Sequence, residues 1–114
     1  MQRVKPAILW FVASADDAAR KAAEVLEGDK IGPDQIDGVA DTLRALFAAG
    51  RPIVGVCSAG ILIRSLAPML NDKHAEPPVI ALSDDGHSIV PLLGGHHGAN
   101  QMATELAEAF SSQA

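Results

Sequence analysis

Cysteine and aromatic residues are scarce in this sequence of 114 residues, which has one cysteine, no tyrosine, one tryptophan and three phenylalanines. A single cysteine, Cys57, excludes an internal disulfide and a multi-thiolate metal site, and it is typical of a reducing compartment. We therefore expect a cytoplasmic protein. Because 20 of the hydrophobic residues are alanines, we also expect a thin aliphatic core in which helices lie close to a sheet.

Long hydrophobic runs are also missing. No stretch approaches the roughly 18–20 apolar residues that span a bilayer. The apolar residues 7–13 follow a short basic N-terminus, but Asp16 and Asp17 come almost directly after them. This pattern predicts a first β-strand and not a signal peptide.

Positive charge is absent from the last third of the chain. Lys73 is the last cation, residues 74–114 hold five carboxylates, and the net charge is −5. An acidic domain without a basic stripe is a poor candidate for binding nucleic acid, and we expect neither nucleic acid nor a membrane as a partner. An anionic ligand would have to be held by individual cations and by helix N-termini.

What is present is an alternation of apolar strands and amphipathic helices. It predicts one α/β domain over residues 1–110, with 111–114 as a tail or a severed linker. The expected fold is a three-layer sandwich, a mostly parallel sheet with helices on both faces and one antiparallel hairpin. Strands are predicted over 7–13, 52–56, 79–82 and 88–91, with a very short one near 30–31, and Asp84-Asp85-Gly86 predicts a hairpin turn between the last two. Helices are predicted over 14–28, with Ser14 as N-cap and Gly28 as terminating residue, from 34 or 37 to 50, over 61–70 and from 100 onward.

Two glycine-rich segments, residues 55–60 and 94–100, each follow a predicted strand and precede a predicted helix. Sheets of this class place ligands beyond the carboxyl ends of their strands. Unpaired N–H groups at helix N-termini favour anions. We therefore expect both segments to contribute to one cleft at that end of the sheet.

Several residues of these segments have more than one interpretation. Cys57 lies in a Gly-x-Cys-x-x-Gly pattern that lacks nucleophile-elbow spacing, so a buried structural thiol is favoured over a nucleophile. Ser58 is favoured as a helix N-cap over a catalytic hydroxyl. His96 and His97 are adjacent and have no carboxylate partner in sequence, so we expect no metal site; acid–base chemistry, a ligand contact and simple loop polarity stay open. Arg64 is either a solvated helix residue or an anion clamp.

A specific set of segments follows residue 52 in order: Pro52-Ile53-Val54-Gly55, Ala59-Gly60-Ile61 with Arg64 and Leu66-Ala67-Pro68, Asp72-Lys73, Pro77-Pro78-Val79, Leu92-Leu93, Gly95-His96 and Gly98-Ala99-Asn100. In these segments the sequence resembles the N-terminal domain of the CbiG family of cobalamin biosynthesis. The resemblance covers residues 52–106, and the earlier residues agree only in their alternation of strand and helix.

The resemblance implies that a corrinoid intermediate is the ligand. Full-length members resemble cobalt-precorrin-5A hydrolases, which open a δ-lactone and release acetaldehyde, and the same module also occurs fused to precorrin-3B C(17)-methyltransferase. Glu76 replaces the usual Asp, Gly94 replaces a usual Ser, and the loop at 96–99 is one residue shorter than in the hydrolases. These departures favour the methyltransferase-fused version, with a part of a hydrolase and a non-catalytic channelling domain as alternatives.

The implied site takes its residues from both glycine-rich segments. His96 is the expected catalytic residue, which would activate a water, and N–H groups near Ala59 and Gly60 would stabilise the oxyanion. The expected substrate contacts are Ser58, Ala59, Gly60, Arg64, Lys73, Gly95, His97, Gly98 and Asn100. No cofactor is expected in this domain, and S-adenosylmethionine only if a methyltransferase domain follows. Other enzymes of cobalamin biosynthesis, or that fused domain, are the expected protein partners.

Overall fold

The computed structural model describes residues 4–70, 75–95 and 98–111, which form five strands and four α-helices. The strands are β1 (Ala7–Trp10), β2 (Asp29–Ile31), β3 (Ile53–Val56), β4 (Val79–Leu82) and β5 (Ile89–Leu93). The helices are α1 (Asp16–Leu26), α2 (Val39–Ala48), α3 (Ala59–Leu66) and α4 (Ala99–Ser111). Short 3-10 turns occupy Ala13–Ala15, Pro33–Gln35 and Ala67–Met69.

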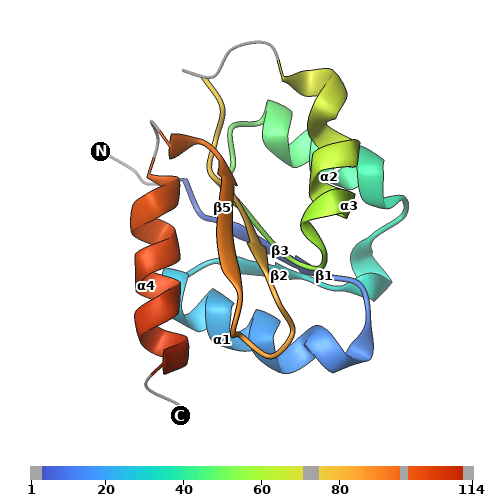
Figure 1. The fold of residues 1–114 in the computed structure, drawn as a ribbon. Coiled ribbons are helices and arrows are strands. Elements are labelled where there is room, and N and C mark those ends of the chain that lie inside the picture. The colour runs from blue at the N-terminus through green and yellow to red at the C-terminus, as the bar shows by residue number, and fades with distance from the viewer. Residues whose placement is uncertain (1–3, 71–74, 96–97, 112–114) are drawn as a thin grey trace.

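The strands form one sheet in the order β2-β1-β3-β4-β5. The first four strands are parallel, and β5 returns antiparallel to β4. The chain therefore moves outward from β1 in one direction and from β3 in the other, which makes the sheet doubly wound. In Figure 1 the hairpin between β4 and β5 lies at the bottom, and β4 and α4 both begin near the top.

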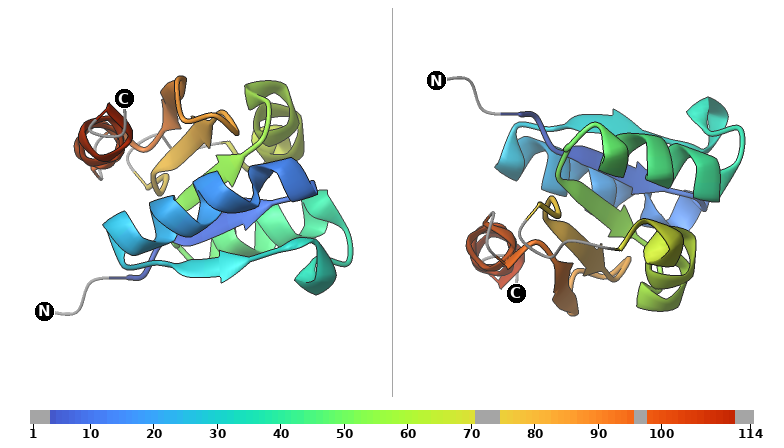
Figure 2. Two further views of the ribbon diagram at one scale, coloured as in Figure 1. Left: turned by 90° about the horizontal axis from the view of Figure 1, so that it is seen from below. Right: turned by 90° about the horizontal axis from the view of Figure 1, so that it is seen from above.

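Two apolar clusters, one on each face of the sheet, confirm the predicted three-layer sandwich. One joins α1 and α4 to the sheet and the other joins α2 and α3 to the opposite face, and the end-on views of Figure 2 show this arrangement. Four alanines of α1 face the sheet, Ala18, Ala19, Ala22 and Ala23. Their small side chains let the helix lie close to the strands, as the alanine content predicts.

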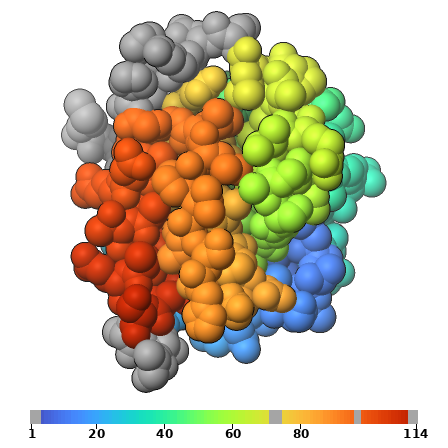
Figure 3. Space-filling model, viewed as in Figure 1, coloured from blue at the N-terminus to red at the C-terminus, as the bar shows by residue number. Residues whose placement is uncertain are grey.

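The second face is incompletely covered. Between α3 and β5 lies an apolar hollow of about 210 Å³, lined by Leu62, Ile63, Leu66, Leu70, Val79, Leu92 and Leu93. Figure 3 shows this side of the molecule, with β5 in orange between α4 and α3.

The element ends differ from the prediction in ways that follow from local geometry. Ser14 does not cap α1: it lies in a 3-10 turn, its hydroxyl contacts Asp84, and the N-cap residue is Ala15. The residue with left-handed backbone after α1 is Glu27 (φ +53°), not Gly28. α2 begins only at Val39, because Gly38 has a φ of +119° that a helix excludes.

The direction of β5 overturns one expectation about the site. We call the end at which β1–β4 begin the amino edge and the end at which they finish the carboxyl edge. Residues 55–60 do lie at the carboxyl edge, where β3 ends. Because β5 runs antiparallel, its carboxyl end reaches the amino edge, and the described residues that follow it, Gly94, Gly95 and Gly98, lie there. The two glycine-rich segments are therefore at opposite ends of the sheet.

Within the described part of the chain, no helix has both the length and the apolar character that crossing a bilayer requires.

Candidate functional site at the amino edge

Three prolines form the rim of the sheet at the amino edge. Pro6, Pro52 and Pro78 directly precede β1, β3 and β4, and we call them the proline row. Their carbonyls continue the ladder across the strands: Asp29 N–H donates to Pro6, Ala7 N–H to Pro52, and Ile53 N–H to Pro78, at 2.8–2.9 Å. Proline has no N–H and a fixed φ. The row is therefore a rigid, apolar rim without unpaired donors.

A cavity of about 440 Å³ lies over the proline row. Its other wall comes from the start of α4, and its lining residues are Val4, Pro6, Gly50, Pro52, Ala75, Pro77, Pro78, Gly98, Gln101 and Met102. None of the described residues in this lining has a charged side chain. The cavity is thus a mainly apolar surface with a few polar backbone groups, which is the usual character of a small-molecule site.

Gly94 fixes the chain between β5 and α4 against the proline segment. Its φ is +80°, and a Cβ there would lie 2.5 Å from the carbonyl of Pro77 and from Cα of Pro78. No side chain fits in that space. On the other side of this connection, a second hollow of about 310 Å³ is lined by Glu76, Pro91, Leu92, Leu93, Gly94, Gly95, Ala99 and Asn100. Gly95 and Asn100 thus line one hollow and Gly98 lines the other.

The N-terminus of α4 opens between the two hollows. Ala99 N–H donates to Gly94 O and Met102 N–H to Gly98 O. Among the described residues, the N–H groups of Asn100 and Gln101 have no backbone acceptor. N–H groups in the first turn, at the positive end of a helix of 13 residues, favour a carboxylate or another anion.

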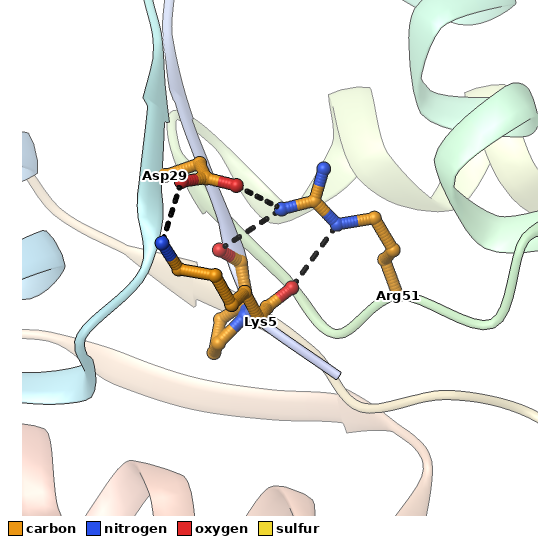
Figure 4. Close-up of polar contacts among 4 residues, drawn as sticks. Lys5, Asp29 and Arg51 are labelled. Carbon is orange, nitrogen blue, oxygen red and sulfur yellow. Dashed lines mark hydrogen bonds and ion pairs between the residues drawn. The ribbon is translucent and has the colours of Figure 1, made fainter. Parts of the chain in front are cut away.

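A cluster of charged residues binds the strands together beside the cavity (Figure 4). The Arg51 guanidinium donates to Asp29 Oδ2 at 2.8 Å and to the carbonyls of Lys5 and Pro6. Lys5 Nζ lies 3.2 Å from the other carboxylate oxygen of Asp29. The hydrogen bonds from Lys5 and then Arg51 hold the pKa of Asp29 below its usual value.

Four of the expected contact residues lie together at the opposite, carboxyl edge. Ser58 is the N-cap residue of α3, as predicted, but its side chain makes no capping hydrogen bond. Ala59 and Gly60 form the first turn of α3. The guanidinium of Arg64 folds back over Gly60, 3.4 Å from where a Cβ would stand. It has no ion pair or hydrogen bond with any described residue.

The expectation that N–H groups near Ala59 and Gly60 act together with the loop after β5 is therefore wrong. The sheet separates them from Gly95 and Gly98, because an antiparallel last strand delivers its following loop to the other end. Asn100, Gly95 and Gly98 do lie together at the amino edge. The predictions for Lys73, His96 and His97 fall outside the described residues.

Cys57 lies just after β3 and is half-buried against the α2–α3 cluster. Burial raises the pKa of its thiol to about 11. A thiol with a raised pKa is a poor nucleophile, in agreement with the structural interpretation. Among residues 4–70, 75–95 and 98–111, no three His, Cys, Asp or Glu side chains lie close enough to hold a metal ion.

Some residues of the amino edge were not predicted from the sequence. Pro6, Gln101 and Met102 line the cavity, and Arg51 supports its wall, yet none was a candidate. The prolines were detectable, since each stands one residue before an apolar strand run. The role of Arg51 was not, because its acceptors are 22 to 46 residues away in sequence.

The doubly wound sheet, with helices on both faces and a proline-lined cavity at one helix N-terminus, defines a three-layer domain of the α/β class. The chain belongs to the cobalamin synthesis G N-terminal (CbiG) family, whose sequence pattern matches residues 41–114. It is 37% identical over 71 residues to a cobalt-precorrin-5A hydrolase of Salmonella typhimurium and 35% identical over 69 residues to one of Priestia megaterium. These matches cover 61% and 60% of this chain, and only 20% and 18% of the two hydrolases.

A crystal structure of a cobalamin biosynthesis protein G homolog from Sulfolobus solfataricus has the same fold. The TM-score is 0.76 at 21% identity, over 94% of this chain and 34% of the homolog. The chain thus spans about a fifth of the length of the two hydrolases and about a third of the length of the homolog.

Proposed function

We propose that this domain binds a ring-contracted corrinoid intermediate of cobalamin biosynthesis at the amino edge, as the N-terminal module of a cobalt-precorrin-5A hydrolase. The observation that carries this proposal is that distant segments of the chain lie together in the fold. Segments that resemble the family but are distant in sequence, around residues 52 and 77–78 and at 95 and 98–100, meet at the two hollows beside the start of α4.

The surface suits the two chemical parts of a corrinoid. The macrocycle is wide and apolar, and it would lie across the proline row and the glycines, where few side chains hinder its approach. Its periphery carries carboxylate arms. One arm would enter the cavity and accept hydrogen bonds from the N–H groups of Asn100 and Gln101, which have no backbone acceptor within the described part of the chain.

Opening of the lactone needs a base for the attacking water and donors for the developing oxyanion. His96 is proposed as the base, since its described neighbours Gly95 and Gly98 border the two hollows. The donors would be N–H groups at the start of α4, and not those of α3. Because the hydrolases that it resembles are about five times longer than the matched segment, the activity is proposed for the whole protein and corrinoid binding for this domain.

A module fused to precorrin-3B C(17)-methyltransferase is the second candidate. The one-residue-shorter loop at 96–99 favours it, whereas the relatives named cobalt-precorrin-5A hydrolase favour the first. Both candidates use the same corrinoid site. A third candidate is a non-catalytic domain that channels intermediates between enzymes. Its site would then show no preference between the substrate of the hydrolase and that of the methyltransferase.

The test compares one bulky substitution at each edge. No described atom lies within 4 Å of the position that a Cβ at Gly95 would take, and the backbone there accepts a side chain. Gly95→Leu should therefore fold normally and obstruct the amino edge. Ser58→Leu is the matched control at the carboxyl edge, with Arg64→Ala beside it. Each variant is titrated with cobyrinic acid, a corrinoid with free carboxylates, followed by visible absorption.

We expect Gly95→Leu to weaken binding at least tenfold, about 1.4 kcal/mol, and the two carboxyl-edge variants to stay within twofold of the native protein. His96→Asn should weaken binding more than His97→Leu. A loss confined to Ser58→Leu or Arg64→Ala would move the site to the carboxyl edge. Absence of binding by the native protein would reject the proposal.

A further inference from the structure

We propose that Arg51 is a positioning residue of the amino-edge site, which holds the proline row in the shape that the ligand meets. The identity of the ligand in this inference rests on the proposed function, whereas the contacts of Arg51 do not depend on it. The sequence segments that carry the resemblance begin at residue 52, so Arg51 is not among them, although the family pattern spans residues 41–114.

Arg51 connects three segments of the sheet at once. Its Nε donates to Lys5 O at 3.0 Å, and its Nη2 donates to Pro6 O at 3.5 Å and to Asp29 Oδ2 at 2.8 Å. Lys5 and Pro6 lead into β1, and Asp29 begins β2. Arg51 itself stands directly before the segment that leads into β3. One guanidinium therefore fixes the starts of three neighbouring strands relative to one another (Figure 4).

These segments are the wall of the cavity. Val4 and Pro6 flank Lys5, and Gly50 and Pro52 flank Arg51, and all four line the cavity. If the guanidinium were removed, Pro6 O would keep only the Asp29 N–H as its donor. The ladder bond from Ala7 N–H to Pro52 O would remain. Lys5 O, however, would lose the Arg51 Nε donor, so the cavity-lining residues on either side of Lys5 and of Arg51 would be held less firmly relative to one another.

The bonding pattern requires arginine in particular. The planar guanidinium offers several N–H groups in a fixed fork, whereas a lysine ammonium is a point charge on a flexible stem. Arg51 is also the least exposed member of the cluster, with 25% of its side chain exposed against 62% for Lys5 and 48% for Asp29. A lysine at position 51 would keep the charge beside Asp29 and lose the bonds to the two carbonyls.

The experiment uses Arg51→Lys and Arg51→Gln, with Arg20→Lys and Arg20→Gln as matched controls. Arg20 is an exposed arginine of α1 whose ion pairs with described residues are to Asp17 and Glu24 of its own helix. Affinity for cobyrinic acid is measured well below the melting temperature of every variant. The circular dichroism of the bound corrinoid is recorded at saturation, since it reports how the chromophore is held and is insensitive to stability alone.

We expect both Arg51 variants to bind at least fivefold more weakly and to change the circular dichroism of the saturated complex, while both Arg20 variants match the native protein. Native binding by Arg51→Lys with weak binding by Arg51→Gln would overturn the proposal, because charge alone would then suffice. A lowered melting temperature with unchanged affinity and spectrum would also overturn it.

If either Arg51 variant fails to fold, a second variant tests the proposal. Asp29→Asn removes one of the three groups that Arg51 contacts, and it should give smaller changes of the same kind. The absence of these changes in Asp29→Asn would overturn the proposal. Failure of the native protein to bind would instead reject the proposed function.

Discussion

At the scale of single residues, the thiol of Cys57 gives the most direct test of the carboxyl edge. Its pKa is raised to about 11 by burial, from an ordinary value of 9.0. At neutral pH the reactive thiolate should therefore be about a hundredfold scarcer than in an exposed cysteine. We expect a thiol reagent to label the native protein at least tenfold more slowly than the protein unfolded in urea. Labelling at equal rates would show that the thiol is free and ionised.

Glu27 is the described non-glycine residue whose backbone is left-handed, with φ at +53°. Its side chain is exposed and makes no hydrogen bond or ion pair with described residues. A glycine adopts this conformation without steric cost, so Glu27→Gly should raise the free energy of unfolding by about 0.5–1 kcal/mol. Urea denaturation measures the change. The control is Gly28→Ala, whose Cβ would lie 2.5 Å from Ile8 Cδ1; it should destabilise the protein, and loss of stability in Glu27→Gly would contradict the argument.

At the scale of elements, the approach of α3 to β3 depends on one missing side chain. A Cβ at Gly55 would lie 2.7 Å from Cδ2 of Leu62, which is fully buried. Gly55→Val should therefore cost about 1–3 kcal/mol of stability through overpacking. In the double variant Gly55→Val/Leu62→Ala the added methyls fill part of the space that the leucine leaves. Its loss should be smaller than the sum of the two single losses by at least about 0.5 kcal/mol in urea denaturation, and simple additivity would show that the two positions do not share space.

Most elements were predictable because their signals are local. The apolar run at 7–13 and the turn residues Asp84-Asp85-Gly86 indicated β1 and the hairpin, and even the short strand near residues 30–31 was confirmed as β2. Helix ends were less predictable. Ser14 has the chemistry of a cap but contacts Asp84, which is 70 residues away in sequence. Tertiary contacts of that kind decide which of two adjacent residues begins a helix.

At the scale of the whole molecule, strand direction decided which candidate residues could meet. The sequence correctly predicts the antiparallel hairpin, and that same hairpin sends the chain after β5 back to the amino edge. Ser58 and Arg64 are thereby separated from Gly95 and Asn100, although all four belong to segments that resemble one family. The order of the motifs along the chain does not show which end of a sheet a loop reaches. The direction of the strand before the loop decides this.

The amino edge is a place where acid should weaken the fold. Lys5 and Arg51 lower the pKa of Asp29 in the native state. The ionised Asp29 therefore stabilises the native state at any pH above the pKa of an unfolded aspartate, which is near 4. This stabilisation is lost as the pH falls through the lower pKa that Asp29 has in the native state. Asp29→Asn should therefore lower the melting temperature at pH 7, and its difference from the native protein should shrink toward zero as the pH falls to about 2. Because the cluster is partly exposed, about 0.5 M salt should reduce the difference at pH 7. Thermal melts across this pH range measure it, with the exposed Asp37→Asn as control. A difference that stays constant or grows toward low pH would show that Asp29 acts through packing and not through its charge.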